Sequence, residues 1–228
     1  MKYRKEVERK ASMPAAEEVP SDCVYTPCYC EENVFWLAKK KLQDQKEETE
    51  THAGLNVKYT VVVVSNPKQA VPLCHQRAAK EDEDVVVWDY HVFLLESNCK
   101  TNKATKVWDM DSKLEFGIKA DEYFNRTFPF EEEQLLAAGF DPVYLKLIDS
   151  EFYVKNFSSS REHMKVVSGN QADDDIKWLA QPPSYPCVLA EDGVSTFGKL
   201  FITEDDVKHE KCEFGKNYVL EQFQHEFL

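Results

Sequence analysis

The chain has 228 residues, with 28 Lys and Arg against 41 Asp and Glu, which gives a formal net charge of −13 at pH 7. This length fits one domain with a tail better than two full domains, and a hydrophobic content of 43% favours a globular fold over disorder. The acidic balance argues against partners such as nucleic acid or an anionic membrane, because both require a basic face. No run of residues approaches the about 20 apolar positions that a membrane span needs.

The first residues differ in character from the rest. Residues 1–20 mix charges with Ala and Pro without an apolar period, so we expect a mobile tail followed by a single domain over residues 21–228. Basic residues in this tail precede no apolar run, which argues against a secretory signal. The seven cysteines are then expected to stay reduced. We therefore expect a cytoplasmic or nuclear protein, and a monomer because no coiled-coil heptad is present.

A helix is expected to begin near Cys30. Apolar residues recur there at helical spacing and form one inward stripe: Cys30, Val34, Leu37 and Ala38. Glu31 and Glu32 lie in the first turn, where acidic side chains suit the helix dipole.

Strand patterns follow. The β-branched run at residues 59–65 predicts a strand, and a turn at 66–68 leads to a second short strand over 70–75. Residues 85–95 are apolar at successive positions, which predicts one central strand covered on both faces. Residues 106–110 predict a further strand.

The C-terminal part has weaker patterns. Residues 131–138 favour a helix, 143–149 do not decide between helix and strand, and 171–186 predict a long polar, Pro-rich loop. Residues 217–227 show apolar positions at helical spacing. A helix, then strands, then helices is typical of an α+β fold with a sheet between helical layers.

Three cysteines lie close together, at Cys23, Cys28 and Cys30. Their spacing differs from the paired C-x2-C pattern of structural zinc sites, which argues against a metal. Each can also be a small buried hydrophobe. Cys30 differs because the unpaired N–H groups of a helix start stabilise a thiolate, which favours a nucleophile. Its acidic neighbours oppose this effect, so a cationic partner is needed.

His91 is the best candidate for that partner. It lies within the predicted central strand, where the alternative is a neutral core histidine bonded to a carbonyl. Asp89 lies on the same strand, and Asp109 and Asp111 lie on the next, so the chain order Cys, His, Asp matches a nucleophile, a base and an orienting acid. The spacing alone does not choose among the three acids. The other histidines are weaker candidates for the partner of Cys30, because they lie in polar or terminal stretches: His52, His75, His163, His209 and His225.

Five separated motifs resemble one known family. CYCEEN, VVVWDYHVFLL, VWDMD, YVKNFSSSREHMK and PPSYPC occur in the order typical of the protein N-terminal glutamine amidohydrolases, whose signature is WDYHV. The resemblance runs from about residue 21 to the C-terminus, and departs from the family only in the tail and in a longer acidic insertion at 46–56. It implies a three-layer α-β-α sandwich akin to papain-like and transglutaminase-like cysteine enzymes. It also implies a catalytic triad of Cys30, His91 and Asp109.

The resemblance further implies an activity. The family converts the N-terminal Gln of a protein or peptide to Glu and releases ammonia, through a thioester and without a metal or organic cofactor, and so feeds the N-end rule degradation pathway. Recognition of the free α-ammonium group calls for a buried carboxylate, for which Asp89 is our candidate; bracing of the strand is the alternative role. Trp88 and Tyr90 are expected to face away from His91 into the core. Rival interpretations are a cysteine peptidase or transglutaminase with the same triad, a binding module without catalysis, and a zinc-binding interaction domain.

Overall fold

The computed structural model describes residues 19–50, 56–80, 84–166, 177–190, 193–208 and 212–228. The tail predicted for residues 1–20 lies outside the described residues except for its last two positions, as do His52 and His209. The helices are α1 (Cys30–Glu50), α2 (Ala120–Thr127), α3 (Glu132–Ala137), α4 (Ser150–Asn156), α5 (Glu204–Lys208) and α6 (Leu220–Phe227), with 3₁₀ turns η1 (Glu162–Met164) and η2 (Phe197–Leu200). The strands are β1 (Val57–Ser65), β2 (Val71–Cys74), β3 (Val85–Trp88), β4 (Tyr90–Asn98), β5 (Ala104–Trp108), β6 (Ile118–Lys119), β7 (Tyr144–Asp149) and β8 (Lys216–Val219).

A six-stranded sheet organises the molecule. Its strand order is β6-β5-β4-β1-β7-β8, and every neighbouring pair is antiparallel. The long central pair β1 and β4 runs in register from Val57 opposite Asn98 to Ser65 opposite Tyr90. Strands β2 and β3 form a separate two-stranded sheet. The fold is α+β.

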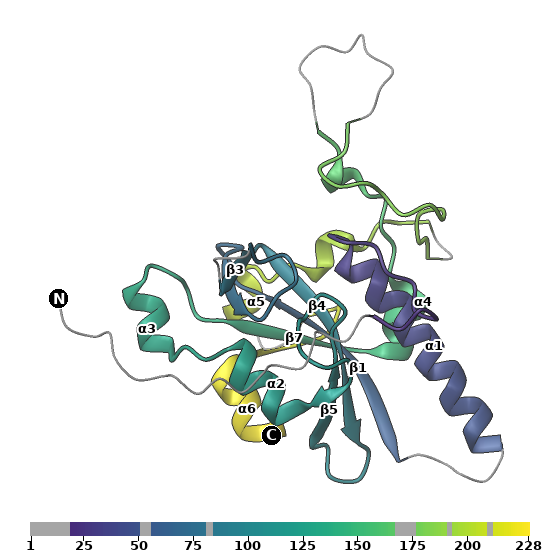
Figure 1. Ribbon diagram of the computed structural model, residues 1–228, viewed down its shortest axis with the longest axis horizontal. Coiled ribbons are helices and arrows are strands. Elements are labelled where there is room, and N and C mark those ends of the chain that lie inside the picture. Colours follow the sequence, from purple (N-terminus) through teal and green to yellow (C-terminus); the bar gives the residue numbers. More distant parts are fainter. Residues whose placement is uncertain (1–18, 51–55, 81–83, 167–176, 191–192, 209–211) are drawn as a thin grey trace.

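Helices cover both faces of the large sheet (Figure 1). Because successive strand residues point to opposite faces, Val61 and Val63 of β1 pack into one core cluster with α1 and α4, whereas Val62 and Val64 pack into the other with α2 and α6. The inward stripe predicted for α1 is confirmed, since all four of its residues are buried in the first cluster. The likeness of this arrangement to papain-like and transglutaminase-like enzymes stays a prediction.

The prediction of one central strand over 85–95 is wrong. The chain forms two strands that separate at Asp89, where the Ser65 hydroxyl donates to the Asp89 carbonyl at 2.8 Å. The last pair that β4 forms with β1 is Ser65 with Tyr90, so the residues before it leave the sheet and β3 pairs with β2 instead. One side of β3 is open, and Val87 is 53% exposed. A run of apolar residues therefore does not report which sheet each half joins.

The C-terminal prediction is wrong in part. Residues 216–219 form β8, which pairs with the otherwise free edge of β7, and only from Leu220 is the chain helical. Edge pairing outweighs the helical spacing here, because the β7 edge offers unpaired backbone groups. Strand β7 also settles the undecided segment 143–149, and α3 agrees with the helix predicted at 131–138 to within a residue at either end.

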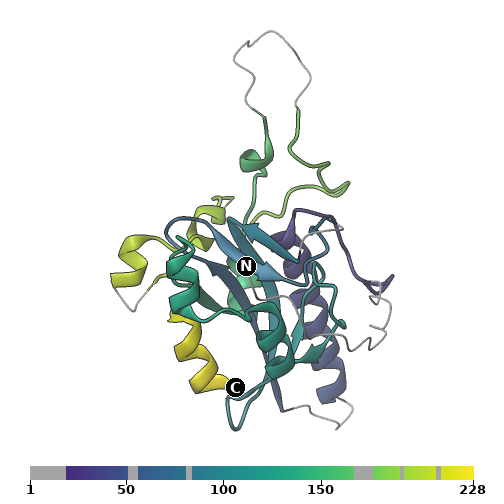
Figure 2. The same cartoon turned by 60° about the vertical axis from the view of Figure 1, so that its left-hand side comes forward.

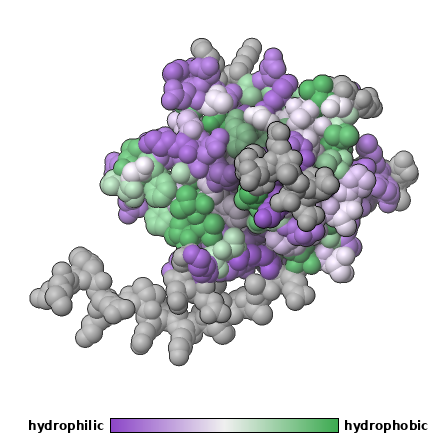
Figure 3. Space-filling model, turned by 90° about the horizontal axis from the view of Figure 1, so that it is seen from above, coloured by the Kyte–Doolittle hydropathy of each residue, from purple (hydrophilic) through white to green (hydrophobic). Residues whose placement is uncertain are grey.

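A loop region projects from one end of the molecule (Figures 1 and 2). The chain on either side of residues 167–176 runs outward from the end where α1 begins. Of the loop predicted at 171–186, residues 171–176 lie outside the described residues, and the rest has no helix and no strand beyond a bridge of Trp178 with Lys165. Seen from this end, apolar surface patches are separated by hydrophilic residues (Figure 3).

Candidate active site

The start of α1 carries Cys30, which is 5% exposed. The Asn33 side chain holds the preceding loop, because it accepts from the backbone N–H of Thr26 and donates to the Thr26 carbonyl, each at 2.8 Å. The Asn33 N–H donates to the Tyr29 carbonyl at 2.9 Å and closes the first helical turn. Between these anchors the backbone passes through a positive φ of 67° at Cys28. The loop and the helix together fix the direction of the Cys30 thiol.

The two glutamates that follow Cys30 are fully buried, which their place in the first helical turn did not indicate. Glu32 forms a bidentate ion pair with Arg161: Nε donates to Oε1 at 2.8 Å and a terminal nitrogen donates to Oε2 at 2.7 Å. Arg161 also donates to the carbonyls of Pro183, Tyr185 and Pro186. One guanidinium thus ties the projecting loop to the first turn of α1.

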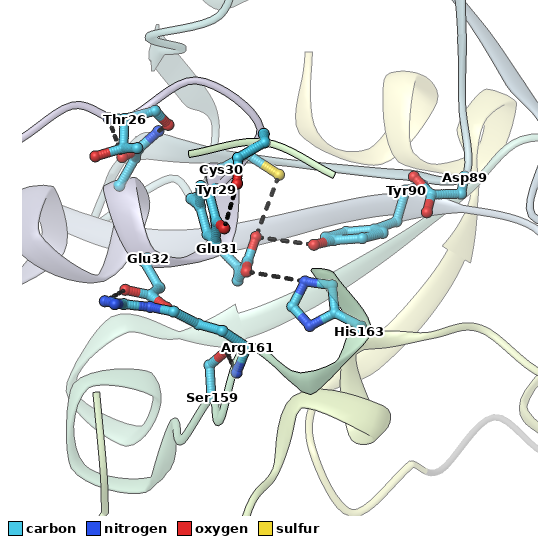
Figure 4. Close-up of polar contacts among 12 residues, drawn as sticks. Thr26, Tyr29, Cys30, Glu31, Glu32, Asp89, Tyr90, Ser159, Arg161 and His163 are labelled. Atoms are coloured by element: carbon cyan, nitrogen blue, oxygen red, sulfur yellow. Dashed lines mark hydrogen bonds and ion pairs between the residues drawn. The ribbon is translucent and has the colours of Figure 1, made fainter. Parts of the chain in front are cut away.

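Glu31 contacts the candidate nucleophile (Figure 4). Its Oε2 accepts a hydrogen bond from the Tyr90 hydroxyl at 2.8 Å and lies 3.7 Å from Cys30 Sγ. Burial raises the pKa of Glu31 to about 7, although the Tyr90 hydrogen bond works in the other direction. Near neutral pH this carboxyl group therefore exists in both protonation states.

The surroundings of Cys30 favour its neutral thiol form. Burial raises its pKa well above the ordinary value, and the nearby Glu31 and Asp111 add to the rise. The backbone N–H of Val92 acts in the opposite direction, because it hydrogen-bonds the thiolate. The lowering of the Cys30 pKa that was expected from the helix start is therefore outweighed, and a base is needed to take the proton of the thiol.

His91 and Asp109 form the second half of the site. His91 Nε2 lies 3.0 Å from Asp109 Oδ1, and the Tyr123 hydroxyl donates to Asp109 Oδ2 at 2.7 Å. Burial works to lower the pKa of His91, but the Asp109 carboxylate outweighs it and the pKa is raised. Burial likewise works to raise the pKa of Asp109, and the contact with His91 reverses this. The Asp111 carboxylate instead accepts a hydrogen bond from Tyr25 at 2.8 Å, so Asp109 is the acid that meets His91.

Cys30 and the pair of His91 and Asp109 are linked through the start of β4. The N–H that stabilises the Cys30 thiolate belongs to Val92, the residue directly after His91. The other ring nitrogen of His91, Nδ1, is buried and has no hydrogen-bond partner in the described structure. The Cys30 thiol donates to Glu31 in this structure. The described contacts do not include a hydrogen bond between Cys30 and His91. Nδ1 is therefore the ring nitrogen of His91 without a partner among the described residues.

Comparison with known proteins now gives the family. A model of the N-terminal glutamine amidase family matches residues 25–227. The chain belongs to this family. Among its relatives, protein N-terminal glutamine amidohydrolase of Arabidopsis thaliana is 35% identical over 170 residues, 75% of this chain and 70% of that protein. Proteins of the same name from Drosophila ananassae, 33% identical over 207 residues (91% and 89%), and Drosophila melanogaster, 34% over 178 residues (78% and 78%), also match.

Two residues of the family's WDYHV signature have contacts that sequence reasoning missed. The Trp88 ring stacks on His91 at 5.4 Å between centroids, and the Tyr90 hydroxyl reaches Glu31. The expectation that both face away from His91 into the core is wrong for Trp88, because the strand breaks at Asp89 and the Trp88 ring turns toward His91. It is confirmed for Tyr90, which is 6% exposed in the core cluster with α1. The position of both residues next to His91 in the WDYHV signature was the one feature of the sequence that could have indicated these contacts.

Asp89 of this family member is exposed, and its Oδ1 accepts the backbone N–H of Tyr90 at 2.9 Å. The expectation of a buried carboxylate there is wrong, because the break in the strand turns this residue toward solvent. Its role in binding the substrate's ammonium group stays a prediction.

His163 also joins the site, although its polar surroundings in the sequence gave no signal. It lies on η1, its ring stacks on Phe197 at 3.8 Å, and its Nε2 is 3.7 Å from Glu31 Oε1. Burial lowers the pKa of His163, while Asp89 works in the other direction. This histidine is therefore a neutral neighbour of Glu31 at neutral pH.

Within the part of the chain that the structure describes, no three or more His, Cys, Asp or Glu side chains are arranged to hold a metal ion. None of the described helices is both long enough and apolar enough to span a bilayer.

Proposed function

We propose that this protein hydrolyses the side-chain amide of an N-terminal Gln, yielding Glu and ammonia, as its relatives' names state for them. Two observations carry the proposal: the buried pair of His91 and Asp109 with His91 Nδ1 unpaired, and the contact of Cys30 with the backbone N–H of Val92, the residue after His91. The substrates are proteins or peptides with a free N-terminal Gln, and the pathway they enter is the N-end rule pathway. A monomeric state and a cytoplasmic or nuclear location remain predictions.

In the proposed mechanism His91 acts first as a base. Its Nδ1 takes the proton of the Cys30 thiol, and the Asp109 carboxylate stabilises the resulting imidazolium. The thiolate then attacks the side-chain amide carbon of the substrate's Gln. This forms a carbon–sulfur bond and moves one electron pair onto the amide oxygen. Backbone N–H groups at the start of α1 are the candidate donors to that oxygen.

Collapse of this intermediate breaks the carbon–nitrogen bond. His91 returns its proton to the departing nitrogen, so ammonia leaves and a γ-glutamyl thioester remains on Cys30. His91 then takes a proton from a water molecule that attacks the thioester. The sulfur leaves with that proton, and the carboxylic acid of the product gives its own proton to the solvent, where the released ammonia becomes ammonium. The chemistry uses water and the three side chains.

The test is an incubation with matched peptides that begin with Gln, Asn and acetyl-Gln, followed by mass spectrometry and an ammonia assay. We expect a gain of about 1 Da on the peptide with free Gln only, and loss of this activity in Cys30→Ala. Cys99→Ser is the matched control, because Cys99 is an exposed free thiol outside the site. A cleaved peptide would support the peptidase alternative and a crosslinked one the transglutaminase. An unchanged mass for all peptides with folded protein would contradict the proposal.

A further inference from the structure

One carboxyl oxygen of Glu31 has no hydrogen-bond partner among the described residues. The carboxyl group is fully buried and Oε2 accepts from Tyr90, but Oε1 is buried without any hydrogen-bond partner in the described structure. His163 Nε2 lies 3.7 Å from Oε1 and is itself without a hydrogen bond. Buried polar atoms are nearly always paired, so a vacant acceptor in a candidate active site points to a ligand. Figure 4 shows Oε1 facing His163 and Oε2 between Cys30 and Tyr90.

The distances suit a particular ligand group. Oε2 of this same carboxyl group is 3.7 Å from Cys30 Sγ. In a substrate glutamine, four bonds of about 1.5 Å join the side-chain amide carbon to the α-nitrogen, so the two atoms are no more than about 5 Å apart. An α-nitrogen held at Oε1 therefore leaves the amide carbon within reach of the thiol.

We propose that Glu31 Oε1 binds the α-ammonium group of the substrate and that the charge of this ammonium activates the neighbouring Cys30 thiol. This inference rests on the proposed function and deepens it, because it makes the free amine part of the catalytic step. Glu31 is then a catalytic residue that touches substrate, in addition to the triad.

Among the residues that the structure describes, no permanent cation pairs with Glu31. Cys30 and Glu32 flank it on α1, Tyr90 faces it from β4, and the Tyr153 hydroxyl of α4 donates to its backbone carbonyl at 3.1 Å. The remaining neighbour is His163, and burial lowers the pKa of that imidazole, so it is neutral at neutral pH. The one guanidinium nearby is engaged by Glu32. In this proposal the substrate's ammonium group adds a positive charge beside Cys30, besides the imidazolium that forms on His91.

Charge coupling gives this arrangement its selectivity. The ionised Glu31 carboxylate raises the pKa of Cys30, and the pKa of Glu31 itself lies at about 7. An ammonium at Oε1 favours the ionised carboxylate and offsets its effect on the thiol, since opposite charges stabilise each other strongly in a buried site. A peptide without a free amine leaves the charge of ionised Glu31 uncompensated, and the thiol resists ionisation.

Glu31 is better suited to this role than Asp89. The exposed Asp89 carboxylate is screened by water and salt, so an ion pair there discriminates weakly. A buried ion pair discriminates more strongly between peptides with and without the amine, because the loss of one partner leaves a buried charge uncompensated. The His163 side chain is 23% exposed and its Nε2 lies 3.7 Å from Oε1, so we expect a displacement of this ring to make room for the ammonium.

The first experiment compares two peptides that differ only in the α-amine. One begins with Gln and the other with 4-carbamoylbutanoyl, which is Gln without its amino group. We expect kcat/KM of the unmodified protein to favour the free amine by about 100-fold or more, and Glu31→Gln to reduce that ratio at least tenfold, mainly through loss on the Gln peptide. Glu122→Gln, an exposed acid on α2, is the control and keeps the ratio. A Glu31→Gln variant that loses activity equally on both peptides overturns the proposal.

The second experiment needs neither turnover nor a variant. The rate at which iodoacetamide alkylates Cys30 is followed against pH by peptide mapping, with a peptide that begins with Gly, because this peptide leaves the side-chain space open. We expect the free peptide to shift the midpoint to lower pH and its N-acetylated form to leave it unchanged. Equal midpoints overturn the inference. If no peptide is deamidated but this shift occurs, the proposed function fails while the ammonium site stands.

Discussion

Asp109 illustrates how a single buried charge is held in place. Three groups reach its two oxygens: His91, the Tyr123 hydroxyl and the backbone N–H of Asp111 at 2.9 Å. Without them the carboxylate would be neutral, because burial favours the protonated form. With them it stays ionised and holds the imidazole by Nε2, and Nδ1 remains the ring nitrogen that the proposed mechanism uses as the base.

Tyr123→Phe tests this arrangement at the level of one hydroxyl. The substitution leaves Asp109 Oδ2 buried without its donor, so we expect a loss of about 1–3 kcal/mol in the free energy of unfolding. We also expect the pKa of Asp109 to rise and kcat to fall about tenfold, since His91 loses part of its counter-charge. Urea denaturation and steady-state kinetics measure both effects. Tyr59→Phe, at a buried tyrosine of the other core cluster, is the control. An unchanged kcat in folded Tyr123→Phe would show that the hydroxyl does not act through Asp109.

The first turn of α1 is the element on which the site depends. Its side chains reach in three directions: Glu31 to β4, Glu32 to the projecting loop and Asn33 to the chain before the helix. Each contact limits a different motion of the helix start. This explains in physical terms why the acids and the amide follow the cysteine directly.

Arg161→Met tests the contact to the loop. The substitution leaves the fully buried Glu32 without its partner, so we expect a loss of about 3–5 kcal/mol in the free energy of unfolding by urea denaturation. Arg126→Met is the control, because it breaks an exposed pair with Glu122 and is expected to change stability by less than about 0.5 kcal/mol. The double variant with Glu32→Gln should recover part of the loss. Equal stability losses in the two arginine variants would mean that the buried pair has no special role.

At the scale of the whole molecule, the antiparallel sheet brings distant segments together. Strand β4 lies between β1 and β5, so His91 on β4 meets Asp109 just after the end of β5. Helix α1 crosses the same strand on its other side and delivers Cys30 to the backbone of Val92. The candidate site therefore lies where one helix start and two strand ends coincide.

The buried carboxyl of Glu31 predicts a pH dependence for the stability of the whole domain. Its pKa of about 7 in the folded chain is higher than its ordinary value of 4.5, so the folded state binds more protons between these values. Its contribution to stability therefore falls as pH rises from about 4.5 to 7 and is constant above that. Glu31→Gln cannot ionise, and we expect it to gain up to about 3 kcal/mol relative to the unmodified protein between pH 4 and pH 8. Urea denaturation at several pH values, with Glu122→Gln as control, measures this gain. Parallel stability curves for all three proteins would contradict the raised pKa.

The local features and the family can be predicted from the order of the residues alone. The apolar stripe of α1 and the β-branched run of β1 follow from periodicity, because a period reports which face of an element is buried. The motifs, read through the resemblance, gave Cys30, His91 and Asp109 together, and the family model confirms the family. Spacing alone left three acids open, since distance along a strand does not say which neighbouring strand lies across from His91.

The strand pairings and polar contacts depend on the three-dimensional fold. It broke the run 85–95 into two strands, made an edge strand of residues 216–219, and turned Asp89 to solvent. It also brought Glu31 into contact with His163, more than 130 residues later, at 3.7 Å. The reason is physical: hydrophobic burial has a period that a sequence records, whereas the partner of a buried polar group depends on which segment the fold places opposite it.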